Sequence, residues 1–206
     1  MRENALILGI TGNIASGKSL IAKAFAEKGA ALVDADQLAR EIVAPGSRVL
    51  QQLIERFGAA ILGKGGEMNR ERLAEIVFAD PAAREALNRI THPAIAELAI
   101  KRLQQLRVNP EVPLVVYEAP LLFEAGAETR VDRVLVVKVD PLQQLQRLMA
   151  RDGLDEAAAR QRIAAQMPQQ QKLARADYVI DNSGSIEAAL RQVAELWERL
   201  VTVAPR

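Results

Sequence analysis

The chain has 206 residues, enough for one main domain with insertions, and 50% of them are hydrophobic. Its 27 basic residues balance 26 acidic ones, and the resulting net charge of +1 argues against a strong nucleic-acid-binding surface. Because there is no cysteine and only one histidine, disulfides, thiolate metal sites and zinc sites built from several histidines are excluded.

In chain order, the first expected elements are a buried strand over residues 6–10 and an amphipathic helix over residues 18–28. The connection between them has the P-loop pattern G-x-x-x-x-G-K-S. Such a loop gathers backbone N–H groups into an anion cradle at a helix N-terminus. Its glycines let the main chain approach phosphate oxygens. The sequence therefore predicts a nucleoside triphosphate site formed by Gly12, Asn13, Ile14, Ala15, Ser16, Gly17, Lys18 and Ser19.

Two residues of this loop have predicted roles of their own. Lys18 can reach the outer phosphates, and the Ser19 hydroxyl can bind Mg²⁺. Eight residues in this order, with a strand before them and a helix after them, make a chance glycine-rich turn improbable.

The next expected strand covers residues 31–33 and ends at Asp34, and a helix over residues 36–43 follows it. In open α/β sheets ligands bind beyond the carboxyl ends of the strands, where Asp34 lies. A carboxylate beside a P-loop can orient or deprotonate an acceptor hydroxyl, or contact the water shell of Mg²⁺. The alternative interpretation of Asp34, Asp36 and Arg40 is a helix cap with a surface ion pair between Asp36 and Arg40.

The sequence between the second and third strands is expected to be helical. Ser47 and Asn69 are typical N-caps for two helices, and Pro81 is typical of the first turn of a third. A glycine-rich loop is expected over residues 58–66, and Pro93 is expected to bend or break the third helix. We interpret this stretch as an insertion beside the sheet.

Three more apolar runs predict strands over residues 114–117, 134–137 and 178–180. Helices are expected over residues 141–151, 155–167 and, capped by Ser185, up to about Val201. Continuous apolar strands separated by helices predict an α/β fold, a five-stranded parallel sheet with helices on both faces.

Residues 120–124, Pro-Leu-Leu-Phe-Glu, leave the third strand at the ligand-binding edge of the sheet. Apolar side chains such as Leu121 and Leu122 can line an acceptor pocket there, although they can equally fill the core. Glu118 lies just before this segment and is a weaker candidate for contact with a metal through water.

Taken in order, these motifs resemble the dephospho-CoA kinase family over about residues 6–201. The P-loop is common to many enzymes, whereas the other motifs are more specific to this family. They are Asp34-Ala35-Asp36 with Arg40, His92-Pro93, residues 120–124, Arg147 with Arg151, and Asn182-Ser183-Gly184.

The resemblance implies phosphorylation of the ribose 3′-hydroxyl of dephospho-CoA with ATP and Mg²⁺, which gives coenzyme A. It also implies an organisation like that of nucleoside monophosphate kinases, within a single P-loop kinase domain. The expected core covers about residues 1–58, 110–150 and 176–206. A helical CoA-binding insertion is expected over 59–109, and a lid over 151–175.

The resemblance also implies roles for individual residues. Those expected to act in catalysis are Asp34, Lys18 and Arg147, and Ser19 is expected to hold the metal. Besides the P-loop, the expected ATP-binding residues are Arg147, Asn182 and Gly184, with Arg151 as a weaker second arginine. Those expected to bind the acceptor are Asp34, Asp36, Arg40, His92, Leu121, Leu122 and Glu124.

The P-loop departs from the family pattern at Asn13 and Ala15, where further glycines are usual. Asn13 is the easier replacement, because asparagine tolerates left-handed backbone geometry better than most residues. The Cβ of Ala15 is expected to point near the phosphate cradle, with an effect on affinity rather than on the type of reaction.

Other functions remain as alternatives. Another small-molecule or nucleotide kinase would share the P-loop and lid. A GTPase is disfavoured, because the chain carries neither an Asn-Lys-x-Asp element nor a switch Asp-x-x-Gly after the third strand. A nucleic-acid-stimulated ATPase is disfavoured by an aromatic content of only 3%.

The cellular setting is predicted mainly from absences. No apolar stretch approaches the roughly 20 residues that span a membrane, and a strand expected at residue 6 leaves no room for a signal peptide. We therefore expect a cytoplasmic protein with neither a membrane nor a nucleic-acid partner. A monomer is expected, with an oligomer as the alternative.

Overall fold

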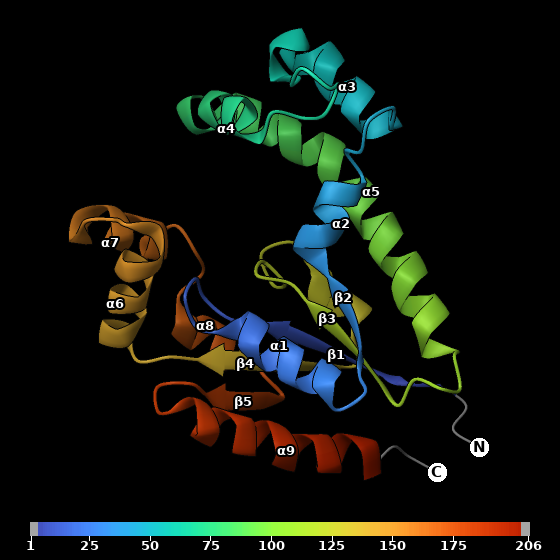
Figure 1. Cartoon of the computed structure of the whole chain (residues 1–206), viewed down its shortest axis with the longest axis vertical. Helices are drawn as coiled ribbons and strands as arrows, with labels where there is room; N and C mark the ends of the chain where they lie inside the picture. The colour runs from blue at the N-terminus through green and yellow to red at the C-terminus, as the bar shows by residue number, and fades with distance from the viewer. Residues whose placement is uncertain (1–3, 203–206) are drawn as a thin grey trace. The chain divides into compact units, whose positions relative to one another are not determined.

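The strands of the chain form one five-stranded parallel sheet (Figure 1). The computed structural model describes residues 4–202. The strands lie in the order β2-β3-β1-β4-β5, and each pairs in parallel with its neighbours. Their bounds are β1 Leu6–Thr11, β2 Ala31–Asp34, β3 Leu114–Glu118, β4 Arg133–Lys138 and β5 Tyr178–Asp181. The predicted fold class and number of strands are confirmed.

Two helices cover one face of this sheet. Side chains of α1 (Lys18–Glu27) and α9 (Ile186–Thr202) join those of four strands in one apolar core. This core includes Leu8, Ile10, Ile21, Phe25, Ile180 and Val193. All five residues of β3 are buried, as expected of a central strand in a sheet covered on both faces.

The carboxyl ends of the strands lie at one edge of the sheet because all of the strands run in parallel. The register places Asp34 of β2 beside Glu118 of β3, and Glu118 beside Ile10 of β1. The P-loop leaves β1 at the same edge and leads into α1. The fold therefore gathers the residues predicted to bind phosphate and metal.

Three further helices lie between β4 and β5, namely α6 (Pro141–Asp152), α7 (Glu156–Ala164) and α8 (Gln169–Leu173). The helix expected over residues 155–167 ends earlier than predicted, at Ala164. Its continuation is opposed by Pro168, which disfavours helical backbone at Met167. Within this segment, α6 and α7 pack through a small apolar cluster of Leu145, Leu148 and Ala159.

The chain divides into two compact units. The unit with the sheet runs up to Asp34 and resumes at Leu103, and the second unit is Ala35–Arg102. The second unit holds α2 (Ala35–Glu41), α3 (Arg48–Phe57), a 3₁₀ turn η1 (Ala59–Ile61), α4 (Arg70–Ala79) and most of α5 (Pro81–Arg107). A second 3₁₀ turn, η2 (Ala127–Arg130), lies in the sheet unit.

The helical unit begins at residue 35, earlier than the insertion expected from residue 59. The reason is that Ile42, Val43 and Leu53 pack with Ile61 and Leu73 in one apolar cluster. The predicted caps are confirmed: Ser47 Oγ accepts a hydrogen bond from Leu50 N at 3.1 Å, and Asn69 Oδ1 accepts one from Arg72 N at 3.0 Å.

Pro93 does not break its helix. The helix α5 continues through it from Pro81 to Arg107, so of the two predicted outcomes, a bend or a break, the break is wrong. A proline removes the hydrogen bond to the carbonyl four residues earlier, here that of Arg89. Both Arg89 and Pro93 are exposed, and water can hydrate that carbonyl.

Candidate functional site

Two glycines of the P-loop cannot be replaced without a collision. A Cβ on Gly12 would lie 2.8 Å from Val137 O and 2.6 Å from Ser16 Oγ. Gly17, the N-cap of α1, has a φ of 85°, and a Cβ there would collide with Asn182 Nδ2. The loop is therefore packed tightly against β4 and the end of β5, with the start of α1 directed toward its hollow.

The interior of the loop contains buried polar atoms without partners. Among the described residues, Ser16 Oγ and Asn13 Oδ1 are buried and accept or donate no hydrogen bond. Such atoms are costly in a finished core and are common where a polar ligand binds. The Ser16 hydroxyl can donate to a phosphate oxygen, as can the N–H groups at the start of α1, whereas Asn13 Oδ1 can only accept a hydrogen bond, for example from water.

Lys18 and Ser19 converge on one buried carboxylate at the end of β3. Glu118 Oε1 lies 2.8 Å from Lys18 Nζ and accepts a hydrogen bond from Ser19 Oγ at 2.6 Å. The side chains of Lys18 and Glu118 are only 13% and 7% exposed. Glu118, the weaker candidate of the sequence analysis, therefore contacts both P-loop residues that are predicted to act on phosphate and metal.

Asp34 lies next to this group. It is the last residue of β2, and the register pairs it with Glu118. In-register residues of neighbouring strands place their side chains on the same face of a sheet. Asp34 is therefore on the face of the sheet where Glu118 reaches Lys18.

The apex of the P-loop, residues 13–15, is held by side chains from the segment between β4 and β5. Gln166 Oε1 accepts a hydrogen bond from Ile14 N at 2.7 Å, and Gln144 Nε2 donates to Ile14 O at 2.9 Å. Asn13 Nδ2 donates to Met167 O at 3.0 Å. Neither glutamine was singled out by the sequence analysis.

Ala15 adopts the left-handed conformation, with a φ of 60°, and is the only described residue other than glycine with a positive φ. The left-handed geometry that was expected to suit Asn13 therefore occurs two residues later, at Ala15. The methyl of Ala15, with the side chain of Ile14, packs against the α6–α7 cluster of Leu145, Leu148 and Ala159. This contact gives the Cβ an apolar partner on the outer side of the loop.

We expect Ala15→Gly to change the free energy of unfolding by less than about 1 kcal/mol. Relief of left-handed strain, about 1–2 kcal/mol, offsets the lost methyl contact and the greater freedom of glycine in the unfolded chain. Ala24→Gly is the matched control, because Ala24 is buried in the right-handed helix α1, where glycine costs about 1 kcal/mol. Urea denaturation measures both; a larger loss at Ala15 than at Ala24 would contradict the strain argument.

The segment of residues 120–124 has two different kinds of side chain. Leu122 is fully buried and packs beside Gly9, so in this conformation it fills the core, whereas Leu121 is exposed. Glu124 pairs with Lys172 at 2.9 Å and accepts a hydrogen bond from Met167 N at 3.3 Å. Leu121 is thus the leucine of this segment that a ligand can reach.

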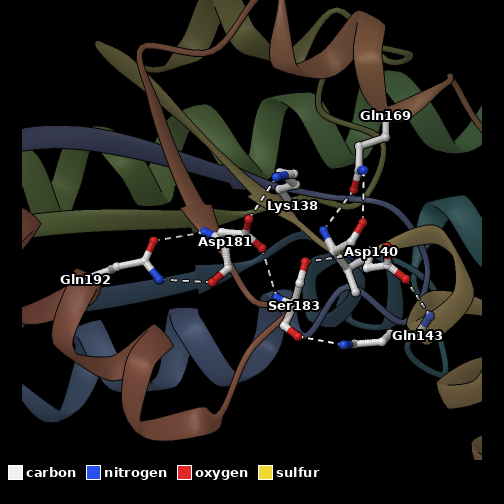
Figure 2. Close-up of polar contacts among 8 residues, drawn as sticks. Lys138, Asp140, Gln143, Gln169, Asp181, Ser183 and Gln192 are labelled. Atoms are coloured by element: carbon white, nitrogen blue, oxygen red, sulfur yellow. Dashed lines mark hydrogen bonds and ion pairs between the residues drawn. The ribbon is translucent and has the colours of Figure 1, made fainter.

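The ends of β4 and β5 are joined by a polar network, shown in Figure 2. Asp181 bonds to Lys138 Nζ at 2.8 Å and to Ser183 N at 2.9 Å, and Gln192 bonds its backbone. The pKa of Asp181 lies below its ordinary value, chiefly because of the hydrogen bond from Lys138 and then that from Ser183. Ser183 Oγ in turn accepts a hydrogen bond from Asp140 N at 2.7 Å.

This network fixes the turn of residues 182–184 against the P-loop. Asn182 is buried, and its Nδ2 donates to Ser16 O at 2.8 Å. Arg147 Nη1 donates to Asn182 O at 3.0 Å. Arg147 and Asn182, two predicted ATP-binding residues, are therefore brought together beside the P-loop, and Gly184 is exposed next to them.

Arg151 lies one turn beyond Arg147 on α6 and has a different environment. It pairs with Asp152 at 2.7 Å, and Asp152 also pairs with Arg162 at 2.9 Å. The pKa of Asp152 lies below its ordinary value, mainly because of the hydrogen bond from Arg151. Asp152 thus joins the end of α6 to α7 through Arg162, and Arg151 pairs with Asp152 from within α6.

The remaining predicted acceptor residues belong to the helical unit. Asp36 and Arg40 are exposed on α2, and His92 is exposed on α5. The same unit contains an apolar hollow of about 330 Å³ between α3, α4 and α5, rimmed by Arg70 and Thr91. In the described part of this unit, all three predicted residues are accessible to a ligand.

Comparison with known proteins identifies the family. The family model described as dephospho-CoA kinase matches residues 6–188. The chain belongs to the dephospho-CoA kinase family.

Individual relatives agree with this assignment. A dephospho-CoA kinase of Syntrophotalea carbinolica is 59% identical over 95% of this chain and 92% of its own length. One of Geobacter sulfurreducens is 50% identical over 94% of this chain and 98% of its own. A solved structure of dephospho-CoA kinase from Campylobacter jejuni is 28% identical, has a TM-score of 0.75, and covers 97% of this chain and 98% of its own.

Within this member of the family, the site uses residues that its motifs did not indicate. Gln144, Gln166 and Lys172 lie in a polar helical segment where many side chains are solvated, so no local pattern separates them from their neighbours. Lys172 is nevertheless fully buried. A lysine without exposed surface is unusual enough to require a partner, and it has two.

The described residues, 4–202, lack two features, a self-contained metal site and a membrane-spanning helix. No group of three or more histidine, cysteine, aspartate or glutamate side chains is arranged to hold a metal by itself. No helix is both long and apolar enough to cross a bilayer.

Proposed function

We propose that this chain transfers the γ-phosphoryl group of ATP to the ribose 3′-hydroxyl of dephospho-CoA, giving coenzyme A and ADP. The observation that carries the proposal is the meeting of Lys18, Ser19 and Glu118 at the end of β3, with Asp34 next in register. Family membership selects the acceptor among those that P-loop kinases use.

The phosphate side of the reaction is assigned to the P-loop. Backbone N–H groups at the start of α1 and the ammonium of Lys18 neutralise charge on the outer phosphates as the phosphoryl group moves. To reach the phosphates, Lys18 must weaken its contact with Glu118. Glu118 then still accepts the hydrogen bond from Ser19 and stays beside the P-loop. The low exposure of the pair strengthens these interactions relative to water.

Mg²⁺ fits the donors present. Ser19 Oγ would hold it directly and Glu118 would hold it through water, because Mg²⁺ prefers oxygen ligands and retains several waters. Two protein oxygens suffice, since phosphate oxygens complete the coordination in sites of this type. When bound, the ion neutralises charge between the β- and γ-phosphates.

Asp34 is assigned to the acceptor hydroxyl. Its position beside Glu118 allows it to orient the hydroxyl or to accept its proton. A loose transition state needs little nucleophilic push, so orientation supplies much of the effect. The main role assigned to Asp34 is therefore to align the acceptor hydroxyl, and its lesser role is to accept the proton of that hydroxyl.

Arg147, Asn182 and Gly184 are assigned to ATP, beside the turn that follows β5. The segment of residues 151–175 is assigned the role of a lid that excludes water from the transfer step. Asp36, Arg40, His92 and Leu121 are assigned to the acceptor, as is the helical unit that contains the first three.

The deciding experiment is a coupled ADP-release assay with MgATP and three acceptors side by side: dephospho-CoA, adenosine and AMP. We expect turnover with dephospho-CoA well above the other two, and a product of one additional phosphate by mass spectrometry. Turnover with another acceptor alone would assign the chain to a different small-molecule kinase activity. The protein is proposed to be a monomer and to act in the cytoplasm. Light scattering measures its oligomeric state.

A further inference from the structure

We propose that the buried pair of Lys172 and Glu124 positions the apex of the P-loop for phosphoryl transfer. The inference rests on the proposed kinase activity and adds a positioning residue, Lys172, that none of the sequence motifs includes. It concerns contacts within the sheet unit only, between α8, residues 120–124 and the P-loop.

Lys172 is buried completely, although it carries a charge on a flexible side chain. Its Nζ lies 2.9 Å from Glu124 Oε1 and donates to Pro120 O at 3.1 Å. Its side chain is 0% exposed and that of Glu124 is 23% exposed. A buried ion pair is weak evidence for stability, because desolvation offsets the attraction. Its use is more often to fix one arrangement of the chain, and here it joins both ends of residues 120–124 to α8.

The pair leads to the P-loop along two short routes. On the first, Pro120 O also accepts a hydrogen bond from Thr11 Oγ1 at 3.2 Å, and Thr11 immediately precedes Gly12. On the second, Glu124 Oε1 accepts from Met167 N at 3.3 Å, and Met167 O accepts from Asn13 Nδ2 at 3.0 Å. Lys172 therefore acts at both the start and the apex of the loop without touching it.

Asn13 gives the second route its specificity to this chain. A glycine at this position, usual in the family motif described above, has no side chain to reach Met167. The residue before Met167 also contacts the apex of the P-loop, because Gln166 Oε1 accepts a hydrogen bond from Ile14 N. Residues 166 and 167 thus bind the apex of the P-loop through two hydrogen bonds. Glu124 holds residue 167 by accepting a hydrogen bond from its backbone N–H.

Further contacts attach α8 to its neighbours in the sheet unit. Gln169 makes two hydrogen bonds to the backbone of Val139 at 3.0 Å each, which ties the start of α8 to the end of β4 (Figure 2). Beyond α8, the guanidinium of Arg175 lies 4.1 Å from the centre of the Phe123 ring and pairs with Glu128. The Lys172–Glu124 pair therefore links residues 166–167 to a helix that is attached to β4 at its start and to residues 123 and 128 beyond its end.

The test separates positioning from stability with three variants: Lys172→Met, Glu124→Gln and the double variant. Lys172→Met leaves Glu124 without its partner, so we expect a lower Tm and a kcat about 10- to 100-fold lower, as misplacement of a site commonly costs. The double variant removes the unpaired charge, and we expect it to recover most of the Tm but not kcat. Arg160→Met is the matched control, since the Arg160–Glu156 pair is exposed on α7, and it is expected to change neither quantity.

A second measurement follows the route to Asn13. We expect Asn13→Gly to lower kcat, and Lys172→Met to cause a smaller loss in that background than in the wild type, because both changes release residue 167 while only Lys172→Met affects the route through Pro120. Independent, multiplicative effects of the two changes would overturn the route. Recovery of kcat together with Tm in the double variant would show the pair to be structural only. A rise in acceptor KM at unchanged kcat in Glu124→Gln would instead make Glu124 an acceptor ligand.

These outcomes are separable from failure of the proposed function. The wild-type protein is first assayed with dephospho-CoA, and its slow hydrolysis of ATP without acceptor is measured in parallel. If another acceptor proves to be the substrate, the same variants are compared with that acceptor. The positioning claim then stands or falls on the variants, independently of the acceptor.

Discussion

Replacing Lys18 by methionine is expected to lower kcat by about 10³-fold while ATP still binds. A positively charged donor aimed at the transferring phosphoryl group supplies a large part of the stabilisation in reactions of this type. Methionine retains most of the side-chain packing, because the Lys18 side chain is only 13% exposed and contacts protein along its length. Steady-state ADP release measures kcat, and titration calorimetry measures ATP affinity.

The variant also leaves Glu118 buried with only Ser19 as a partner, which reduces stability by about 1–3 kcal/mol. Lys23→Met is the matched control, because Lys23 lies on the same helix but is 76% exposed, in a loose pair with Glu27. We expect the control to retain wild-type turnover. Near-normal turnover of Lys18→Met itself would remove the assignment of the P-loop to phosphate chemistry.

The parts of the fold that the sequence predicts are those that depend on short stretches of chain. Continuous apolar runs indicate the five strands, because a strand buried on both faces needs no alternation. Ser47 and Asn69 begin helices by accepting hydrogen bonds from backbone N–H groups three residues later, which is local chemistry. The P-loop pattern likewise lies within eight consecutive residues.

The contacts that the sequence does not predict join residues far apart in the chain. Lys172 meets Pro120, Asn182 meets Ser16, and Gln166 meets Ile14 only because β1 lies between β3 and β4 in the sheet. Strand order is a property of the whole fold, and a single glutamine or lysine in a polar helix carries no sign of it. The buried state of Lys172 is therefore visible only in three dimensions.

Sequence patterns also fail to predict the backbone where a residue allows two conformations and its surroundings select one. Pro93 could end α5 or remain inside it, and exposure of the affected carbonyl to water permits the second. Ala15 could be expected to avoid a φ of 60°, but closure of the loop between β1 and α1 imposes it. The cost is about 3 kcal/mol or more for a proline inside a helix and about 1–3 kcal/mol for a strained backbone position, and the packing of a much larger unit offsets both.

Replacing Asp34 by asparagine is expected to lower kcat by about 10²-fold or more, with little change in ATP affinity. Asparagine keeps the size and one carbonyl oxygen, so β2 still pairs with β3 and the neighbouring Glu118 still reaches Lys18. What is lost is the negative charge that aligns the acceptor hydroxyl and receives its proton. The effect therefore belongs to the transition state and is visible in kcat rather than in the binding of ATP.

Asp36→Asn is the matched comparison, two residues further along and exposed on α2. Asp36 is assigned to binding of the acceptor, whereas Asp34 is assigned to its reacting hydroxyl. We therefore expect Asp36→Asn to raise the acceptor KM while kcat falls little. Single-turnover measurements at saturating ATP and acceptor separate the chemical step from binding for both variants. An equal loss of kcat and of ATP affinity in Asp34→Asn would place Asp34 with the nucleotide instead, and the alignment of the hydroxyl would then have to come from another residue at this edge of the sheet.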